Sequence, residues 1–466
     1  MLTLLVILVI GGYAIYVLTP EERLRIARRA GGAGRSGLRA ALDRHHVPEP
    51  FRDALRARTP WAFVTGAIVF VNVTVVILMS LGAGSIGDTE TLVRWGANFA
   101  PLTTNGEWWR LATSLFVHAG FFHMLMHVIG LAQAGIVMER MAGHVAFATV
   151  YVAAGLLASI DTVSTHPMTI MSGSTGAVFG IYGLLFAALV WSLLQRTAEA
   201  PSLLGDLRGS LGLSQLGLSQ ASSGVQAHPI VRQSETVELA DPDRPAKLPM
   251  FTLKSLITLA APMGLFVFYT AGAGLLDTSA LSGLVAGFGA GLVLTRNASE
   301  AKAPLLHAAA VAVVALIVVV GSAAMLTGVA DVRPEIAKVI ALEDRTAVEY
   351  EKAVSQFRKG SMSSQALAKM INQTIVPELR AAQARLKSVR GVPAEHQALV
   401  ASADEYFKLR DESWRLRADA LNKLNMKALR AADRSERASL EALQRIRPAE
   451  TPPPVDAAKP PAQPSK

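Results

Sequence analysis

The most prominent pattern in this chain is a series of long uncharged stretches separated by polar segments. A helix needs about 20 mainly apolar residues to cross the roughly 30 Å hydrocarbon layer of a membrane. Eight stretches approach or exceed that length, and the fourth is the shortest. They lie at residues 1–18, 61–83, 114–137, 145–160, 172–194, 255–275, 278–295 and 304–328. The pattern therefore predicts an all-α polytopic membrane protein.

Composition agrees with this class. Of the 466 residues, 51% are hydrophobic and 17% are charged, which is more apolar than a soluble chain of this size. The absence of cysteine excludes disulfides and cysteine-ligated metal sites. The net charge of +9 is explained by loop arginines, so we expect the lipid bilayer as a partner, with no nucleic acid and no cofactor.

The distribution of arginine predicts the orientation. Residues 19–60 carry ten arginines against five acidic residues, so this segment is expected to be cytoplasmic and, secondarily, to contact anionic lipid. The loop at 84–109 has Arg94 as its single basic residue and is expected outside. Residues 1–18 lack the flanks of a cleaved signal peptide, which predicts a retained N-terminal transmembrane helix. We expect a multi-pass protein of the cell (inner) membrane.

Two segments outside the apolar stretches have their own composition. Residues 195–254 are rich in Ser, Gly, Leu and Gln without clear periodicity, which predicts a cytoplasmic insertion. Residues 331–448 place apolar side chains at helical spacing in three segments, which predicts an antiparallel helical bundle or coiled coil. Alternation puts this bundle outside the cytoplasm, where a protein partner could meet it. The Pro- and Ala-rich tail at 449–466 is expected to be disordered.

The uncharged stretch at 172–194 opens with a turn that bears hydroxyl groups. Its sequence is Gly173-Ser174-Thr175-Gly176-Ala177-Val178-Phe179-Gly180. This run resembles Gly-Ala-Ser-Gly-Ala-Ile-Phe-Gly, the active-site signature of rhomboid intramembrane serine proteases, with Thr175 at the serine position. The resemblance covers residues 61–328 and implies a rhomboid-like six-helix core with an extra N-terminal and an extra C-terminal transmembrane helix.

Other motifs follow in the order of that family. Trp109 and Arg110 are similar to its tryptophan-arginine entry loop, and a two-histidine pattern ends at His123. Glu139 matches the acidic exit of the same helix. A late apolar helix carries spaced glycines that resemble those of the family's sixth helix, and small residues let helices in membranes pack closely. The glycines expected at that contact are Gly176, Gly180, Gly283 and Gly287.

The resemblance implies a chemistry that this chain has largely lost. The family's histidine base precedes the sixth-helix glycines as His-x-x-Gly-x-x-x-Gly, and Ala280 stands at that position. Its oxyanion is held by a histidine and an asparagine, and here these positions are His123 and His127. Alanine cannot accept a proton. We therefore expect a pseudoprotease that binds transmembrane segments of partner proteins.

Other interpretations remain open. His123 and His127 are four residues apart and share a helix face, so either could be a relocated base for Thr175 or Ser174 in an active serine/threonine-type endopeptidase. Alternatively, these hydroxyls cap the helix or bond backbone carbonyls, and the histidines make structural hydrogen bonds. We expect no metal site, since no carboxylate or cysteine accompanies the histidines. A further alternative is a membrane scaffold for the outer bundle.

Overall fold

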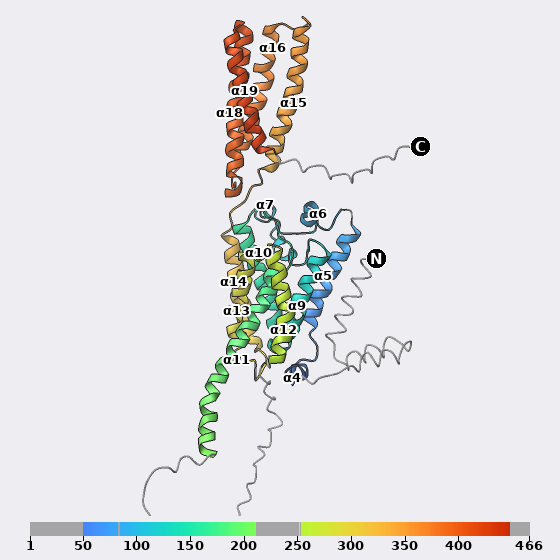
Figure 1. The fold of residues 1–466 in the computed structure, drawn as a ribbon, viewed down its shortest axis with the longest axis vertical. Coiled ribbons are helices and arrows are strands. Elements are labelled where there is room, and N and C mark those ends of the chain that lie inside the picture. The colour runs from blue at the N-terminus through green and yellow to red at the C-terminus, as the bar shows by residue number, and fades with distance from the viewer. Residues whose placement is uncertain (1–49, 83, 211–250, 252, 448–466) are drawn as a thin grey trace, which may run out of the picture. The chain divides into compact units, whose positions relative to one another are not determined.

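The computed structural model describes residues 50–82, 84–210, 251 and 253–447. It divides into two compact units, Met1–Leu326 and Thr327–Lys466 (Figure 1). All regular elements in the described ranges are helices, apart from one isolated bridge between Asn98 and Met171. The chain is therefore an all-helical protein with a membrane unit and a C-terminal helical unit.

Long apolar helices build the first unit. Six of those in the described ranges are long and apolar enough to cross a membrane. A seventh, α13, is apolar but has 17 residues. The long helices are α5 (Phe63–Leu81), α9 (Phe121–Ala142), α10 (His144–Thr165), α11 (Thr175–Ser210), α12 (Leu253–Gly272), α13 (Thr278–Leu294) and α14 (Leu305–Ala324).

Short helices connect or flank the long ones. Before α5 lies α4 (Pro50–Arg58), and between α5 and α9 lie α6 (Thr89–Arg94), α7 (Ala100–Thr103) and α8 (Arg110–Thr113). Figure 1 shows α4 at one end of the long helices and both α6 and α7 at the other. The two ends of the membrane unit thus carry different short helices.

The helices agree with the apolar pattern from residue 61 onward. Each of the seven uncharged stretches between 61 and 328 contains one helix, although α9 begins seven residues after the start of its stretch. The N-terminal helix predicted at 1–18, most of the Arg-rich segment and the tail at 449–466 lie outside the described residues. In the predicted insertion, α11 continues through Ser210, and the segment 211–250 lies outside the described residues.

Helices α10, α11 and α13 pack through small residues. A Cβ atom at Gly283 would lie 2.1 Å from the Gly176 carbonyl oxygen, and one at Gly287 would lie 1.9 Å from the Gly180 oxygen. On the other side of α11, a Cβ atom at Gly180 would lie 2.3 Å from the Ala154 methyl group. Such backbone approach is available only to glycine, so these residues fix the register in which α13 lies against α11.

The C-terminal unit contains four antiparallel rods around one apolar core (Figure 1). The second rod is irregular, because one π-helical turn, η2, interrupts it. Its elements are α15 (Arg333–Arg358), α16 (Ser364–Met370), η2 (Ile371–Ile375), α17 (Val376–Ser388), α18 (Ala394–Lys423) and α19 (Met426–Ile446). The helical bundle agrees with the sequence pattern, whereas the number of rods exceeds the three predicted segments.

The apolar spacing of residues 331–448 did not predict α19 as a separate helix. The chain reverses at Leu424, which adopts a left-handed conformation with φ of 52°. Asn425 then caps the new helix by accepting hydrogen bonds from the backbone N–H groups of Lys427 and Ala428. Asparagine is a strong N-cap residue, so Leu424-Asn425 was the available signal.

Candidate active site

Thr175 is the first residue of α11 and is buried. The turn before it depends on Gly173, whose φ is +101° and whose N–H donates to the Ser114 carbonyl at 2.9 Å. A Cβ atom at Gly173 would lie 3.0 Å from His123 Nε2. Glycine therefore lets the chain turn into α11 directly beneath the histidines of α9.

His127 of α9 contacts the Thr175 hydroxyl, with 3.0 Å between Nε2 and Oγ1. The other ring nitrogen, Nδ1, lies 2.9 Å from the backbone carbonyl oxygen of His123. A carbonyl only accepts, so the neutral ring carries its proton on Nδ1 and leaves an acceptor lone pair on Nε2. We assign the Thr175 O–H as the donor to Nε2, because this assignment satisfies both bonds.

His123 has the opposite tautomer. Its Nδ1 accepts a hydrogen bond from the backbone N–H of Ala119 at 3.2 Å, so the proton of the neutral ring lies on Nε2. This Nε2 is buried and has no hydrogen-bond partner within the described ranges. It lies next to Gly173, the residue that precedes Ser174 in the hydroxyl-bearing turn. An unpaired N–H beside a nucleophile position is the kind of donor that an oxyanion requires.

Ala280 lies in the first turn of α13 and is fully buried. Asp277 caps this helix, and its Oδ1 accepts from the N–H groups of Ser279 and Ala280. The Gly283 contact with Gly176 places the first turn of α13 beside the first turn of α11. The side chain at the proposed base position is therefore an inward methyl group without a titratable atom.

Ser174 differs from Thr175 in its surroundings. It is buried and lies beside the Tyr151 hydroxyl of α10. Of the two neighbouring hydroxyls, Thr175 is the one hydrogen-bonded to His127.

Loops and helix ends are stabilised by contacts of Trp109, Arg110 and Glu139. Arg110 donates to the Ala97 carbonyl and to Glu107, and its guanidinium lies 4.6 Å from the centre of the Trp109 ring. Glu139 is fully buried and accepts from the backbone N–H groups of Val64 and Thr65 at 2.8 and 2.7 Å. It thereby accepts hydrogen bonds from N–H groups that have no acceptor within the first turn of α5.

Helix α12 covers the site from the side, a contact that its apolar pattern did not predict. The Phe266 ring lies 5.1 Å from the His127 ring centre, edge to face. The Tyr269 ring lies 6.2 Å from that of His123. On the other face of α12, Phe268 is 79% exposed in the absence of lipid. One helix thus separates the histidines from the surroundings.

His118, His123 and His127 lie close together, with ring centres between 4.5 and 5.4 Å apart. In the described part of the chain, no group of three or more His, Cys, Asp or Glu residues is arranged to hold a metal ion. The three rings form an edge-to-face cluster beside Thr175.

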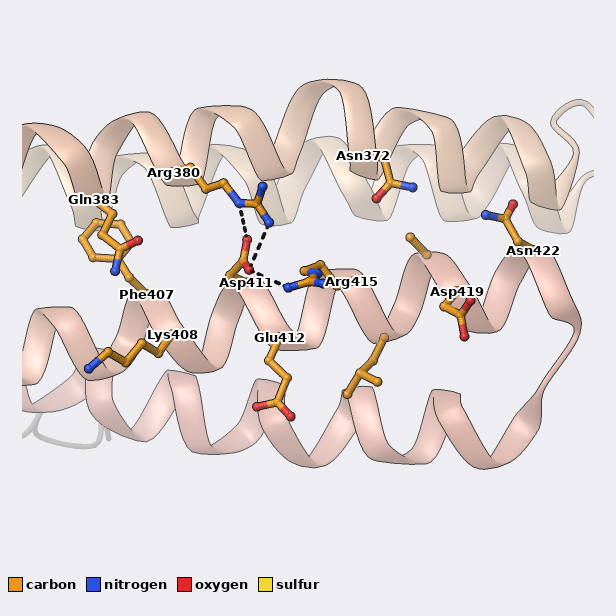
Figure 2. Close-up of a pocket in the computed structure, with 12 residues that line it drawn as sticks. Asn372, Arg380, Gln383, Phe407, Lys408, Asp411, Glu412, Arg415, Asp419 and Asn422 are labelled. Carbon is orange, nitrogen blue, oxygen red and sulfur yellow. Dashed lines mark hydrogen bonds and ion pairs between the residues drawn. The ribbon is translucent and has the colours of Figure 1, made fainter.

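The C-terminal unit has a groove of about 800 Å³ between α17 and α18 (Figure 2). Arg380 binds Asp411 across it through two hydrogen bonds, of 2.9 and 3.3 Å. Acidic and basic side chains are mixed along the groove, so it has no single sign of charge with which to select an ion. Its lining consists of Asn372, Arg380, Gln383, Phe407, Lys408, Asp411, Glu412, Arg415, Leu416, Ala418, Asp419 and Asn422.

Beneath this surface the bundle contains a buried ionic network. Arg410 of α18 contacts Glu343 of α15 at 2.5 Å and Glu436 of α19 at 2.8 Å, and Tyr406 donates to Glu343 at 2.7 Å. Burial and the Glu343 charge raise the pKa of Tyr406. Burial opposes ionisation of Glu436, but Arg410 and Arg417 together hold the pKa of this carboxyl below its usual value. The network joins three helices inside the bundle.

Comparison with known proteins relates part of the membrane unit to a known family. Residues 105–207 match the family profile described as Rhomboid domain. The chain is 36% identical over 126 residues to the rhomboid protease GluP of Bacillus subtilis, covering 27% of this chain and 24% of that protein. It is 40% identical over 87 residues to the putative rhomboid protease YdcA of the same organism, covering 18% and 44%.

A third relative carries a different description. The chain is 34% identical over 108 residues to the inactive RHOMBOID-like protein 8 of Arabidopsis thaliana, covering 22% of this chain and 30% of that protein. The chain thus spans less than half the length of these three relatives. No solved structure matches it. The profile match includes Thr175 and the three histidines and ends before Ala280. The match therefore assigns residues 105–207 to the Rhomboid domain family.

Proposed function

We propose that the membrane unit binds transmembrane segments of other membrane proteins without the serine–histidine chemistry of its family. The observation that carries this proposal is the buried Ala280 methyl group beside the first turn of α11. A general base must lie within hydrogen-bond reach of the hydroxyl, and alanine offers no atom that accepts a proton. The site next to Thr175 then serves for recognition.

A transmembrane segment could reach the site if α12 moved aside, and two properties of α12 favour this movement. This helix contains Pro262, which removes one backbone hydrogen bond, and few of its side chains are buried. Its inner face supplies Phe266 to the His127 ring, and its outer face meets lipid. Displacement of α12 would therefore open the site laterally to a helix that already lies in the bilayer.

In this proposal the six-helix core consists of α5 and α9–α13, with α14 and residues 1–18 as additional transmembrane helices. The protein lies in the inner membrane, with Thr175 near the outer surface and the C-terminal unit outside the cytoplasm. There the groove of Figure 2 is available to a protein partner.

Reporter fusions test this topology. Fusions after residues 140 and 225 are expected to report the cytoplasm, whereas fusions after residues 100 and 400 report the outer side. The physical reason is the arginine excess of residues 19–60, which favours the cytoplasmic side. A cytoplasmic signal at residue 400 would contradict the proposed number of spans.

A second function is favoured by the hydrogen bond between Thr175 and His127. The imidazole accepts from the hydroxyl at 3.0 Å while the His123 carbonyl holds its Nδ1–H, and the His123 Nε2–H remains available for an oxyanion. This arrangement contains a nucleophile, a base, an orienting group and a donor. It would support endopeptidase activity with a threonine nucleophile and a relocated base. Direct attack is opposed by the threonine methyl group.

Covalent labelling with a fluorophosphonate probe separates the two functions. We expect no labelling of the wild-type protein, since loss of a dyad member lowers turnover by about 10⁴- to 10⁶-fold in soluble serine proteases. Thr175→Ser combined with Ala280→His supplies the family's dyad and is the positive control.

Labelling of the wild type that is lost in Thr175→Ala and in His127→Ala, and kept in Ser174→Ala, would overturn the first function in favour of the second. Binding of transmembrane segments is tested separately with a photo-crosslinking residue in place of Tyr269, on the side of α12 that faces His123 of α9. Crosslinks to membrane proteins are expected there, and not from Val314 on the exposed face of α14. A membrane scaffold for the C-terminal unit would give neither labelling nor site-specific crosslinks.

A further inference from the structure

A group of arginines lies at the end of the membrane unit opposite to α6 and α7 (Figure 1). Arg52 and Arg56 are one helical turn apart on α4, and Arg140 is in the last turn of α9. All three border one small cavity, which is floored by apolar side chains and by the buried Gln133. Its lining includes three guanidinium groups. Arg56 also pairs with Asp53, with 3.5 Å between Nη1 and Oδ1.

The neighbouring residues indicate the depth of this cluster in the membrane. Helix α4 is amphipathic, because Phe51 and Leu55 are buried and Phe51 packs on Phe251 with 4.6 Å between ring centres. Trp61 and Phe63, between α4 and the start of α5, are 56% and 60% exposed. Exposed aromatic side chains at the end of a transmembrane helix lie at the level of the lipid headgroups. The arginines are therefore at headgroup level.

Protein contacts hold these side chains in place. Arg52 Nη2 donates to Gln133 Oε1 at 3.4 Å, and Arg140 Nη2 donates to the Pro60 carbonyl at 3.2 Å. The arginine next along the chain has a different role. Arg58 donates to the carbonyl groups of Ala298 and Ser299, at 2.6 and 3.0 Å, and so ties α4 to the turn after α13.

We propose that Arg52, Arg56 and Arg140 form a binding site for the phosphate group of an anionic phospholipid. Guanidinium groups bind phosphate oxygens through paired N–H donors, and three of them converge at the depth where such phosphates lie. Leu55 and Val137 form the apolar floor of the same cavity. A bound lipid then joins α4 to the end of α9.

The test uses the full-length protein in a neutral detergent with added phosphatidylglycerol or phosphatidylcholine. Native mass spectrometry measures the retained lipid, and thermal unfolding measures stabilisation. Phosphatidylglycerol is expected to bind more tightly than phosphatidylcholine. Binding should weaken roughly five-fold for each arginine changed to glutamine, and on the order of a hundred-fold for Arg52→Gln with Arg56→Gln and Arg140→Gln.

The matched control is Arg94→Gln, which removes the same charge from the exposed face of α6 at the opposite end and should leave lipid binding unchanged. Unaltered phosphatidylglycerol binding in the three single variants would overturn the proposal, whether or not the triple variant folds. Equal stabilisation by inorganic phosphate would also overturn it, because the site would then bind a free anion.

Discussion

Gly287→Ala is expected to destabilise the membrane unit by about 3 kcal/mol or more, at the upper end of the range for overpacked cores. The added Cβ atom would lie 1.9 Å from the Gly180 carbonyl oxygen, and that atom belongs to a helix backbone that cannot move aside. Helices α11 and α13 must therefore separate. Thermal unfolding of the purified protein, followed by circular dichroism, measures the effect.

Gly289 provides the matched control on the same helix. A Cβ atom there would have no neighbour within 4 Å, so Gly289→Ala should be neutral or slightly stabilising through helix propensity. Equal losses of stability in the two variants would contradict the close α11–α13 contact. That result would also remove the reason for placing Ala280 beside Thr175.

Arg410→Ala is expected to destabilise the C-terminal unit by about 3–5 kcal/mol, because it leaves the Glu343 carboxylate buried without its partner. Both side chains are almost fully buried, and Tyr406 alone would remain hydrogen-bonded to the carboxylate. The truncation also removes a guanidinium that lies 4.4 Å from the centre of the Trp414 ring. Hydrogen exchange of the α18 amides in the full-length protein measures the loss.

Arg380→Ala is the control for this prediction. Arg380 makes a well-aligned ion pair with Asp411, but its side chain is 55% exposed and the pair is solvated. Exposed pairs contribute about 0–1 kcal/mol, so exchange in α18 should change little. If Arg380→Ala had the larger effect, the buried network would not be what holds α15, α18 and α19 together.

The chain pattern predicted most of the helices because hydrophobicity and breaks are local properties. Each apolar stretch from 61 to 328 contained a helix, and the glycine spacing correctly indicated that α11 and α13 make close contact. The apolar pattern did not predict the number of helices in the C-terminal bundle, because the chain reversal there depends on a single residue. Leu424 in a left-handed conformation produced a fourth rod in the bundle, and a π-helical turn interrupts the second.

The sequence by itself determined the membrane class, most helix positions and the rhomboid resemblance, and it proposed Thr175 and Ala280 for the family's catalytic positions. Only the tertiary structure decided which hydroxyl meets a histidine. His127 and Thr175 are 48 residues apart, and their bond depends on how α9 and α11 pack and on the turn at Gly173. The same holds for the cover of Phe266 and for the arginine cluster of α4 and α9. These contacts join separate helices, and the periodicity of one helix carries no information about the rotation of its neighbour.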